Sequence, residues 1–86
     1  MLRISKLTDY GTMILVHLAV HQGRLNSASD VATGTRLALP TVQKLLKLLA
    51  RSDLVRSVRG AEGGYVLART PATISAADIL DVLEGP

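Results

Sequence analysis

Cysteine, phenylalanine and tryptophan are absent from the sequence. Without cysteine, these 86 residues contain no disulfide, no thiolate-bound zinc, no cysteine nucleophile and no iron–sulfur cluster ligated by cysteine. Without phenylalanine and tryptophan, the core has to consist of leucine, valine, isoleucine and alanine, a composition that favours helices. The most apolar run, residues 13–20, is interrupted by His17 and is far shorter than the roughly 18 residues that span a bilayer. We therefore expect a soluble cytoplasmic protein with no membrane partner.

The charge of this small chain is unevenly distributed. Eighty-six residues, 48% of them hydrophobic, suit one globular domain and leave no room for a second. Residues 36–69 contain seven of the ten basic residues and two of the seven acidic ones, so this segment carries +5 and the rest of the chain −2. A local excess of positive charge is typical of a phosphate-binding surface when it coincides with a helix–turn–helix pattern.

The spacing of apolar residues predicts four helices and one β-hairpin. A glycine-rich loop separates the two β-branched or aromatic runs of the hairpin, which are residues 55–58 and 65–68. The pattern predicts a mainly α fold with a small β-hairpin, a winged helix–turn–helix domain over residues 1–86. Its expected elements are helices at about 6–22, 28–34, 40–52 and 76–84 and a wing hairpin at about 55–68.

Polar and conformationally special residues mark the expected helix ends. Ser27 and Ser75 each precede an aspartate by three residues, a spacing typical of helix N-caps. Gly34 lacks a Cβ and suits the left-handed position that closes many helices. Pro40 suits the first position of the third helix, where no N–H donor is needed. The first helix has two candidate caps, Ser5 and Thr8.

The third predicted helix has two distinct faces when its residues are placed about 100° apart. For an isolated helix, a basic face opposite an apolar one is more often a solvated surface. As the second helix of a helix–turn–helix, it is expected to enter the major groove of DNA instead. The apolar face consists of Val42, Leu45, Leu46 and Leu49. The polar face consists of Gln43, Lys44, Lys47 and Arg51, with Thr41 and Leu48 at the margin.

Position along this helix predicts different tasks for its polar residues. Thr41, Gln43 and Lys44 lie near the N-terminal end, where side chains reach base edges. Glutamine pairs with adenine and lysine donates to guanine, although both residues are equally suited to phosphate contacts. Lys47 and Arg51 lie further along, towards the phosphates.

Two further regions are expected to contact DNA. Arg59, beside Gly60 at the hairpin tip, is placed to enter a minor groove, where narrow A·T-rich stretches concentrate negative potential. Glycine at position 60 permits a close approach of the backbone. Ser5 and Lys6, at the start of the first helix, are expected to add phosphate contacts.

No catalytic or metal-binding constellation is visible in the sequence. His17 and His21 have the spacing of a metal-binding pair, but no glutamate of an HExxH motif lies between them and no third ligand is near, so ordinary histidines are favoured. The loop at residues 59–64 lacks the Lys-Ser or Lys-Thr that follows a nucleotide-binding loop. We therefore expect no enzyme and no metal site.

Three stretches of the sequence resemble the Rrf2 family of bacterial winged-helix transcription regulators. They are LTDYGTMILVHLA, LALPTVQKLLKLLARSDLVRSVRGAEGGY and ISAADILDVLEGP, and the resemblance extends over essentially the whole chain. The most specific part is the wing pattern from Leu54 to Tyr65. The nearest likeness is to regulators of the SUF iron–sulfur-assembly operon, and the cluster-sensing regulator IscR is a more distant relative.

The resemblance implies a homodimer that binds palindromic promoters, with Thr41, Gln43 and Lys44 in recognition positions and Arg59 in the minor groove. It also implies that longer members sense a signal through an iron–sulfur cluster held by three cysteines after the fourth helix. Asp9 falls where some members supply an acidic cluster ligand to the other subunit. Here an ordinary acid in the first turn of a helix is favoured, because the cysteines are absent.

We therefore expect a DNA-binding regulator, with iron–sulfur assembly genes as its targets and double-stranded DNA as its partner. Ending at Pro86, the chain is expected to be a fragment of a longer regulator, without a cofactor of its own; the codons that follow Pro86 test this. The rival interpretation is a winged-helix module for protein interaction, in which the basic face meets an acidic protein and the first helix forms a dimer.

Overall fold

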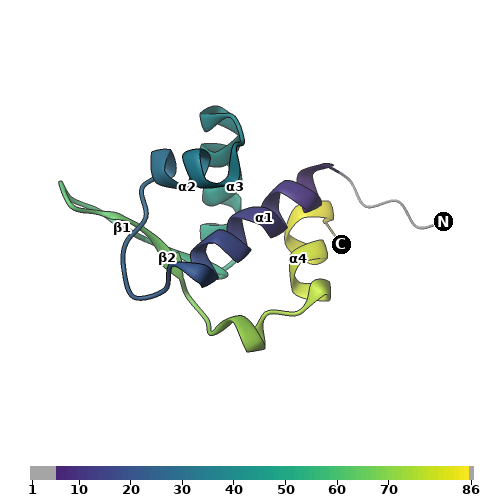
Figure 1. The fold of residues 1–86 in the computed structure, drawn as a ribbon. Helices are drawn as coiled ribbons and strands as arrows, with labels where there is room; N and C mark the ends of the chain where they lie inside the picture. Colours follow the sequence, from purple (N-terminus) through teal and green to yellow (C-terminus); the bar gives the residue numbers. More distant parts are fainter. Residues whose placement is uncertain (1–5, 86) are drawn as a thin grey trace.

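A computed structural model describes residues 6–85, which form four α-helices, a two-stranded sheet and one 3₁₀ turn (Figure 1). This arrangement confirms the predicted mainly α fold with a small hairpin. In chain order, the elements are α1 (Lys6–Val20), α2 (Ala28–Thr35), α3 (Leu39–Arg51), β1 (Val55–Val58), β2 (Gly64–Leu67), η1 (Pro71–Thr73) and α4 (Ala76–Glu84).

One apolar core joins the helices to the base of the hairpin. Side chains from α1, α2 and α3 meet in its centre, and each fully buried leucine, isoleucine or valine contributes roughly 1.5–3 kcal/mol relative to an exposed one. Leu54 and Val55 extend this core to the start of β1, and Leu83 extends it to α4. The apolar core residues with no exposed surface are Ile14, Val31, Val42, Leu45, Leu46 and Leu49.

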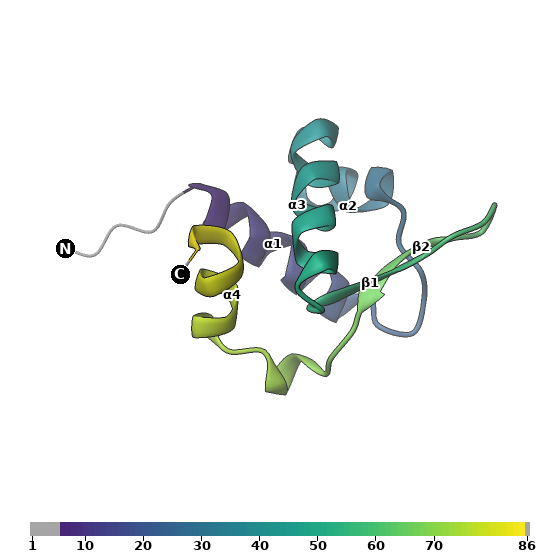
Figure 2. The same cartoon turned by 180° about the vertical axis from the view of Figure 1, so that it is seen from behind.

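The C-terminal helix α4 packs beside the N-terminal half of α1 (Figures 1 and 2). Gly11 lies directly against Leu83, so a Cβ at position 11 would clash with the leucine side chain. The Thr8 hydroxyl is buried and donates a hydrogen bond to the carboxylate of Glu84. Thr8 therefore lies inside α1 and does not cap it, contrary to one prediction, and the other predicted cap, Ser5, lies outside the described residues.

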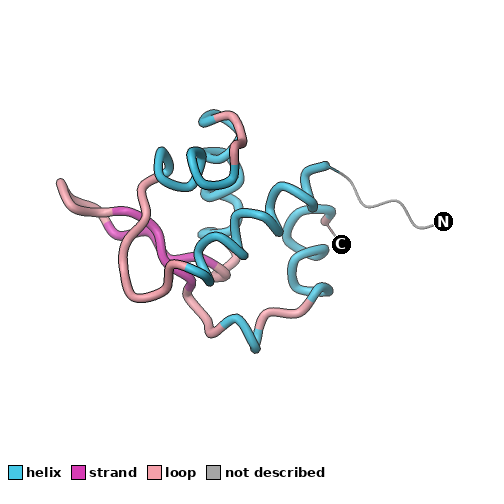
Figure 3. Tube along the Cα trace, viewed as in Figure 1, coloured by secondary structure: helices cyan, strands magenta, loops and turns pink. Residues whose placement is uncertain are grey.

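The hairpin is held to the helices by its second strand. β1 and β2 are antiparallel, with Val55 opposite Leu67 and Val58 opposite Gly64. The loop between α1 and α2 passes beside the hairpin (Figure 3), where Asn26 forms an isolated bridge with Tyr65. The two backbone hydrogen bonds of this bridge measure 3.0 and 2.7 Å. Asn26 thus pairs with β2 in the way that a third strand would, but over one residue only.

Several element boundaries differ from those predicted. Helix α1 ends at Val20, two residues early, because residues 21–23 turn and Gly23 adopts a positive φ of 94°. Helix α3 begins at Leu39 and ends at Arg51, one residue earlier at each end than expected. Strand β2 likewise starts and ends one residue early.

The prediction for Gly34 is wrong. The left-handed residue that closes α2 is Arg36, with φ 61° and ψ 25°. Gly34 lies within α2 against the ring of His17, and a Cβ there would clash with that ring. Glycine suits this position because α1 and α2 approach each other closely and leave no room for a side chain.

Candidate nucleic-acid interface

Helix α3 presents a polar face to solvent and an apolar face to the core. Its four inward residues, Val42, Leu45, Leu46 and Leu49, have no exposed surface. No acidic residue lies between Leu39 and Arg51. Outward-facing side chains line a shallow hollow along the helix, namely Pro40, Gln43, Lys44, Lys47, Leu48 and Arg51. The outer surface of α3 is therefore uniformly positive or neutral.

A tight turn orients α3 against α2. The Thr35 hydroxyl donates to the carbonyl of Val31 (2.7 Å) and accepts from the backbone N–H of Leu37 (3.4 Å). Arg36, in the left-handed conformation, reverses the chain between the two helices. Helix α2 itself starts with a complete capping box between Ser27 and Asp30, as the serine spacing predicted. These local bonds hold the helix–turn–helix geometry.

The wing ends in a compact turn with Arg59 beside it. The N–H of Gly63 donates to the carbonyl of Gly60 (3.0 Å), and Gly60 has a φ of 122° that glycine adopts without strain. A Cβ at position 63 would clash with the backbone carbonyl of Val58, so the turn closes tightly only with glycine there. Arg59 is exposed at this tip.

Helix α3 and the wing form one extended surface. Figure 2 shows α3 on the near side of the molecule, with the hairpin projecting beside its C-terminal end. The structure thus brings five predicted site residues onto neighbouring elements: Gln43, Lys44, Lys47, Arg51 and Arg59. All five are exposed, and Thr41 is half-buried at the start of the same helix.

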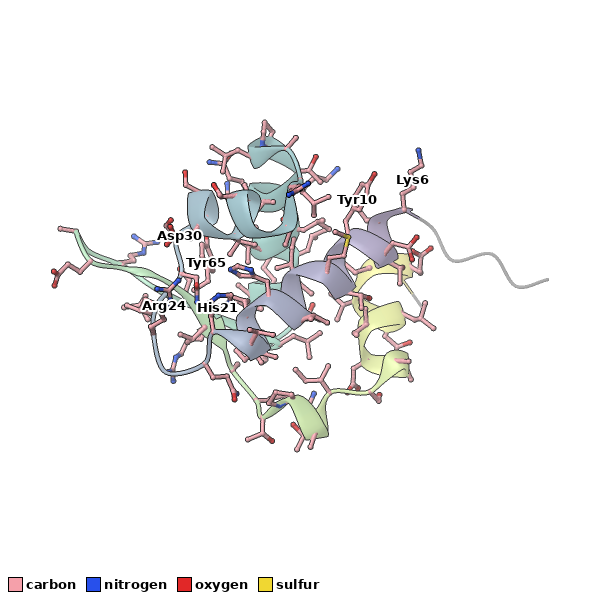
Figure 4. The ribbon with its side chains drawn as sticks, in the orientation of Figure 1. Lys6, Tyr10, His21, Arg24, Asp30 and Tyr65 are labelled. Atoms are coloured by element: carbon pink, nitrogen blue, oxygen red, sulfur yellow. The ribbon has the colours of Figure 1, made fainter. Side chains whose placement is uncertain are left out.

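Lys6 is not part of this surface. It lies at the start of α1, at the opposite end of the molecule from the wing (Figure 4). Ser5, its predicted companion, lies outside the described residues. The predicted phosphate contact of Lys6 is therefore separate from the α3 and wing surface.

Asn26 is a structural determinant of this interface that sequence reasoning did not identify. It is fully buried, its backbone pairs with Tyr65 of the wing, and its side-chain amide donates to the carbonyl of Arg24 (3.2 Å). Gly64 permits this contact, because a Cβ there would lie 2.8 Å from the Asn26 carbonyl oxygen. A pairing that involves one residue leaves no periodic pattern in the sequence. The only available signal was that a polar residue, Asn26, directly precedes the Ser27 cap.

The two predicted ordinary histidines stack on each other. The rings of His17 and His21 lie 4.2 Å apart, and His21 Nδ1 is 2.8 Å from the carbonyl oxygen of His17. Burial lowers the pKa of His17 below its usual 6.5, and the positive charges of His21 and Arg24 lower it further, against an opposing effect of Asp30. His17 is therefore mainly neutral at pH 7.

Asp9, the candidate cluster ligand, is exposed in the first turn of α1. Within residues 6–85, no three histidine or acidic side chains gather in a way that holds a metal ion. A lone carboxylate does not provide the ligands of an iron–sulfur cluster. The described residues by themselves therefore do not fit such a cofactor.

The sequence profile of the Rrf2 family, described as an iron-dependent transcriptional regulator, matches residues 4–86. The chain is 40% identical over 86 residues to the HTH-type transcriptional regulator CymR of Bacillus subtilis, covering 99% of this chain and 62% of that protein. It is 34% identical to the HTH-type transcriptional regulator IscR of Cereibacter sphaeroides, covering 96% of this chain and 56% of that protein. The chain thus spans less than two thirds of the length of these curated relatives.

Solved structures show the same arrangement. CymR, described as the global cysteine regulator of B. subtilis, superposes with a TM-score of 0.92 at 41% identity, over 100% of this chain and 67% of that one. T. potens IscR superposes with a TM-score of 0.89 at 41% identity, over 98% of this chain and 62% of that one.

These relatives are transcriptional regulators, a non-enzymatic class, as the sequence led us to expect. The described part of the chain has no helix with the length and apolar character that crossing a membrane requires.

Proposed function

Since the chain belongs to the Rrf2 family of transcriptional regulators, we propose that it regulates transcription by binding operator DNA through α3 and the wing. The surface of α3 is the observation that carries this proposal. Four of its side chains have no exposed surface, and its opposite side presents Gln43, Lys44, Lys47 and Arg51 with no acidic residue among them. A helix with this charge distribution, held as the second helix of a helix–turn–helix, suits the major groove.

The proposed contacts differ along α3. Thr41, Gln43 and Lys44 belong to the N-terminal half of the helix, the part that faces base edges when a recognition helix docks. Lys47 and Arg51 follow at one-turn spacing towards the C-terminus, where they are suited to phosphates. We assign base recognition to the first group and sequence-independent affinity to the second.

The wing is proposed to contact a neighbouring minor groove. Arg59 is exposed at the tip, and the Gly60–Gly63 turn keeps the backbone beside it narrow. The Asn26–Tyr65 bridge fixes the hairpin relative to α2, so the distance between α3 and Arg59 is held by backbone hydrogen bonds. A narrow minor groove attracts such an arginine electrostatically.

The proposal extends to contacts at the N-terminus, to the oligomeric state and to the cellular location. Ser5 and Lys6 are proposed to contact flanking phosphates, because the start of a helix attracts anions. A homodimer acting in the bacterial cytoplasm is proposed from the family resemblance. A cluster ligand role for Asp9 is proposed only for a longer chain that supplies cysteines.

Iron–sulfur assembly genes are the proposed targets. The description of the family profile as iron-dependent and the likeness to IscR support this choice. The likeness to CymR, described as a global cysteine regulator, favours cysteine metabolism as the competing target class.

A salt titration tests the DNA-binding proposal. The operator is first selected from random duplexes, and its affinity is then measured by fluorescence anisotropy against a scrambled duplex. Each phosphate contact is expected to add about −0.9 to the slope of log K against log salt. Equal, salt-insensitive affinity for both duplexes would contradict the proposal and favour the protein-interaction module.

The position of the selected operators tests the target class separately. Operators upstream of iron–sulfur assembly genes in the source genome are the expected result. Operators upstream of cysteine-metabolism genes would reject the iron–sulfur assignment while leaving the DNA-binding proposal intact.

A further inference from the structure

A hollow of about 370 Å³ lies between the loop that follows α1 and the hairpin. Its volume falls in the range of small-molecule sites, which is roughly 300–1,000 Å³. The loop supplies a continuous stretch of the wall from His21 to Leu25, and β1 and β2 supply the opposite side with Arg56, Val66 and Leu67. Leu18 forms its floor, because this side chain is almost completely buried.

The lining of this hollow is positively charged. It contains two guanidinium groups, Arg24 and Arg56, together with the imidazole of His21, and it contains no carboxylate. Both arginines are exposed, and within residues 6–85 neither one takes part in an ion pair. In Figure 4, Arg24 and His21 lie next to each other at the bend of the loop.

The carboxylate of Asp30 lies near enough to Arg24 for the arginine charge to lower the pKa of Asp30, after the larger effect of the Ser27 hydrogen bonds. An oxygen of this carboxylate accepts from the backbone N–H of Ser27 (3.0 Å) in the capping box of α2. Asp30 does not line the hollow. Within residues 6–85, no ion pair joins Arg24 to Asp30, so the guanidinium is open to a ligand in the hollow.

The hollow lies on the side of the hairpin away from α3, and Arg56, Val66 and Leu67 of its lining belong to the wing strands. Figure 2 shows α3 on the near side with the loop after α1 behind the hairpin, and Figure 1 shows the reverse order. None of the residues that line the hollow belongs to α3.

We propose that Arg24, Arg56 and His21 form a binding site for a small free oxyanion, such as the phosphate or carboxylate group of a metabolite. Two guanidinium groups on opposite walls bind an oxyanion through charge-assisted hydrogen bonds, which are stronger than neutral ones. The occupant connects the loop to β1, the strand that leads to Arg59.

Titration with inorganic phosphate, followed by amide chemical shifts at constant ionic strength, tests this proposal. Saturable shifts are expected in residues 21–25, 56 and 66–67. Arg24→Ala and Arg56→Ala are each expected to weaken phosphate binding roughly tenfold or more. Arg36→Gly is the matched control, because it removes one positive charge outside the hollow at a left-handed position that glycine adopts readily.

Three results would overturn the proposal. The first is a linear, unsaturated response of these amides to phosphate. The second is an equal loss of phosphate affinity in the Arg36→Gly control, which would indicate a general charge effect. The third is no phosphate binding combined with a DNA salt slope that Arg56→Ala reduces by about 0.9, since the arginine would then be a DNA phosphate contact. The first two results are obtained with free phosphate and without DNA, so they do not depend on the proposed DNA-binding function.

Discussion

Helices α1 and α3 both bury one apolar face, but their opposite faces differ. On α3 the solvent-facing side is polar and basic. On α1 it includes Met13, Val16 and Val20, which are 40%, 56% and 73% exposed. Burial alone therefore does not distinguish the roles of two amphipathic helices. The uncovered face does so, because charge suits phosphates whereas exposed apolar surface suits another apolar surface, in agreement with the proposed homodimer.

The largest expected effect is a loss of folding stability, and it concerns the buried face of α3. Leu46→Ala in α3 removes a side chain with no exposed surface and is expected to lower the free energy of unfolding by roughly 2–5 kcal/mol. Val16→Ala in α1 shortens a half-exposed side chain and is expected to change it by no more than about 0.5 kcal/mol. Urea denaturation measures both. Similar losses in the two variants would show that the outer side of α1 is covered in solution.

The next effect concerns DNA affinity. Arg59→Ala is expected to cost about 1–3 kcal/mol of operator binding and to weaken the preference for A·T-rich steps, because a minor-groove contact is lost. Lys47→Ala is expected to weaken all duplexes alike and to reduce the salt slope by about 0.9. Anisotropy titrations measure both, with Ala77→Ser on α4 as the control. Unchanged operator affinity in the Arg59 variant would remove the wing from the proposed interface.

A smaller effect concerns the helix that orients α3. Helix α3 has no side-chain cap of its own, whereas α2 starts with a capping box. Ser27→Ala is expected to destabilise the fold by about 1 kcal/mol, because the N–H of Asp30 loses its acceptor. Ser29→Ala, an exposed change in the first turn of the same helix, is the matched control. Equal denaturation midpoints for the two variants would argue against a capping contribution.

The smallest expected effect is a pH dependence of folding stability, which arises from His17 on α1. The pKa of His17 in the fold lies below the usual 6.5 mainly because of burial; the charges of His21 and Arg24 lower it further, whereas Asp30 and Asn26 raise it. The unfolded chain therefore binds a proton more readily, so stability is expected to fall as the pH drops below about 6.5.

Urea midpoints between pH 7.5 and 5.5 measure this dependence, and His17→Gln is expected to flatten it. Asp30 and Asp78 do not interfere in this range. Capping hydrogen bonds from Ser27 and Ser75 lower the pKa of these carboxyls below 3.8, so their contribution is lost only at more acidic pH. An unchanged slope in the His17 variant would assign the dependence to another group.

Local features were predictable from the sequence. Ser27 and Ser75 cap their helices as expected, since an N-cap involves residues only three positions apart. The division of α3 into two faces was equally predictable, because helical periodicity alone determines it. Gly34 was misassigned because its role depends on the ring of His17, a partner from a different helix. The contact of Asn26 with Tyr65 was missed for the same reason.

The four helices and the hairpin, the serine caps of α2 and α4, the basic surface of α3 and the family resemblance were predictable from the sequence, because each depends on neighbouring residues or on composition. Only the tertiary structure decided that Asn26 holds the wing, that Lys6 lies apart from the α3 and wing surface, and that Arg24 and Arg56 face one hollow. The contact of Asn26 with the wing and the hollow shared by Arg24 and Arg56 bring together residues up to about 40 positions apart in the sequence. Such residues come into contact only when the shared core forms, and no local pattern encodes that pairing.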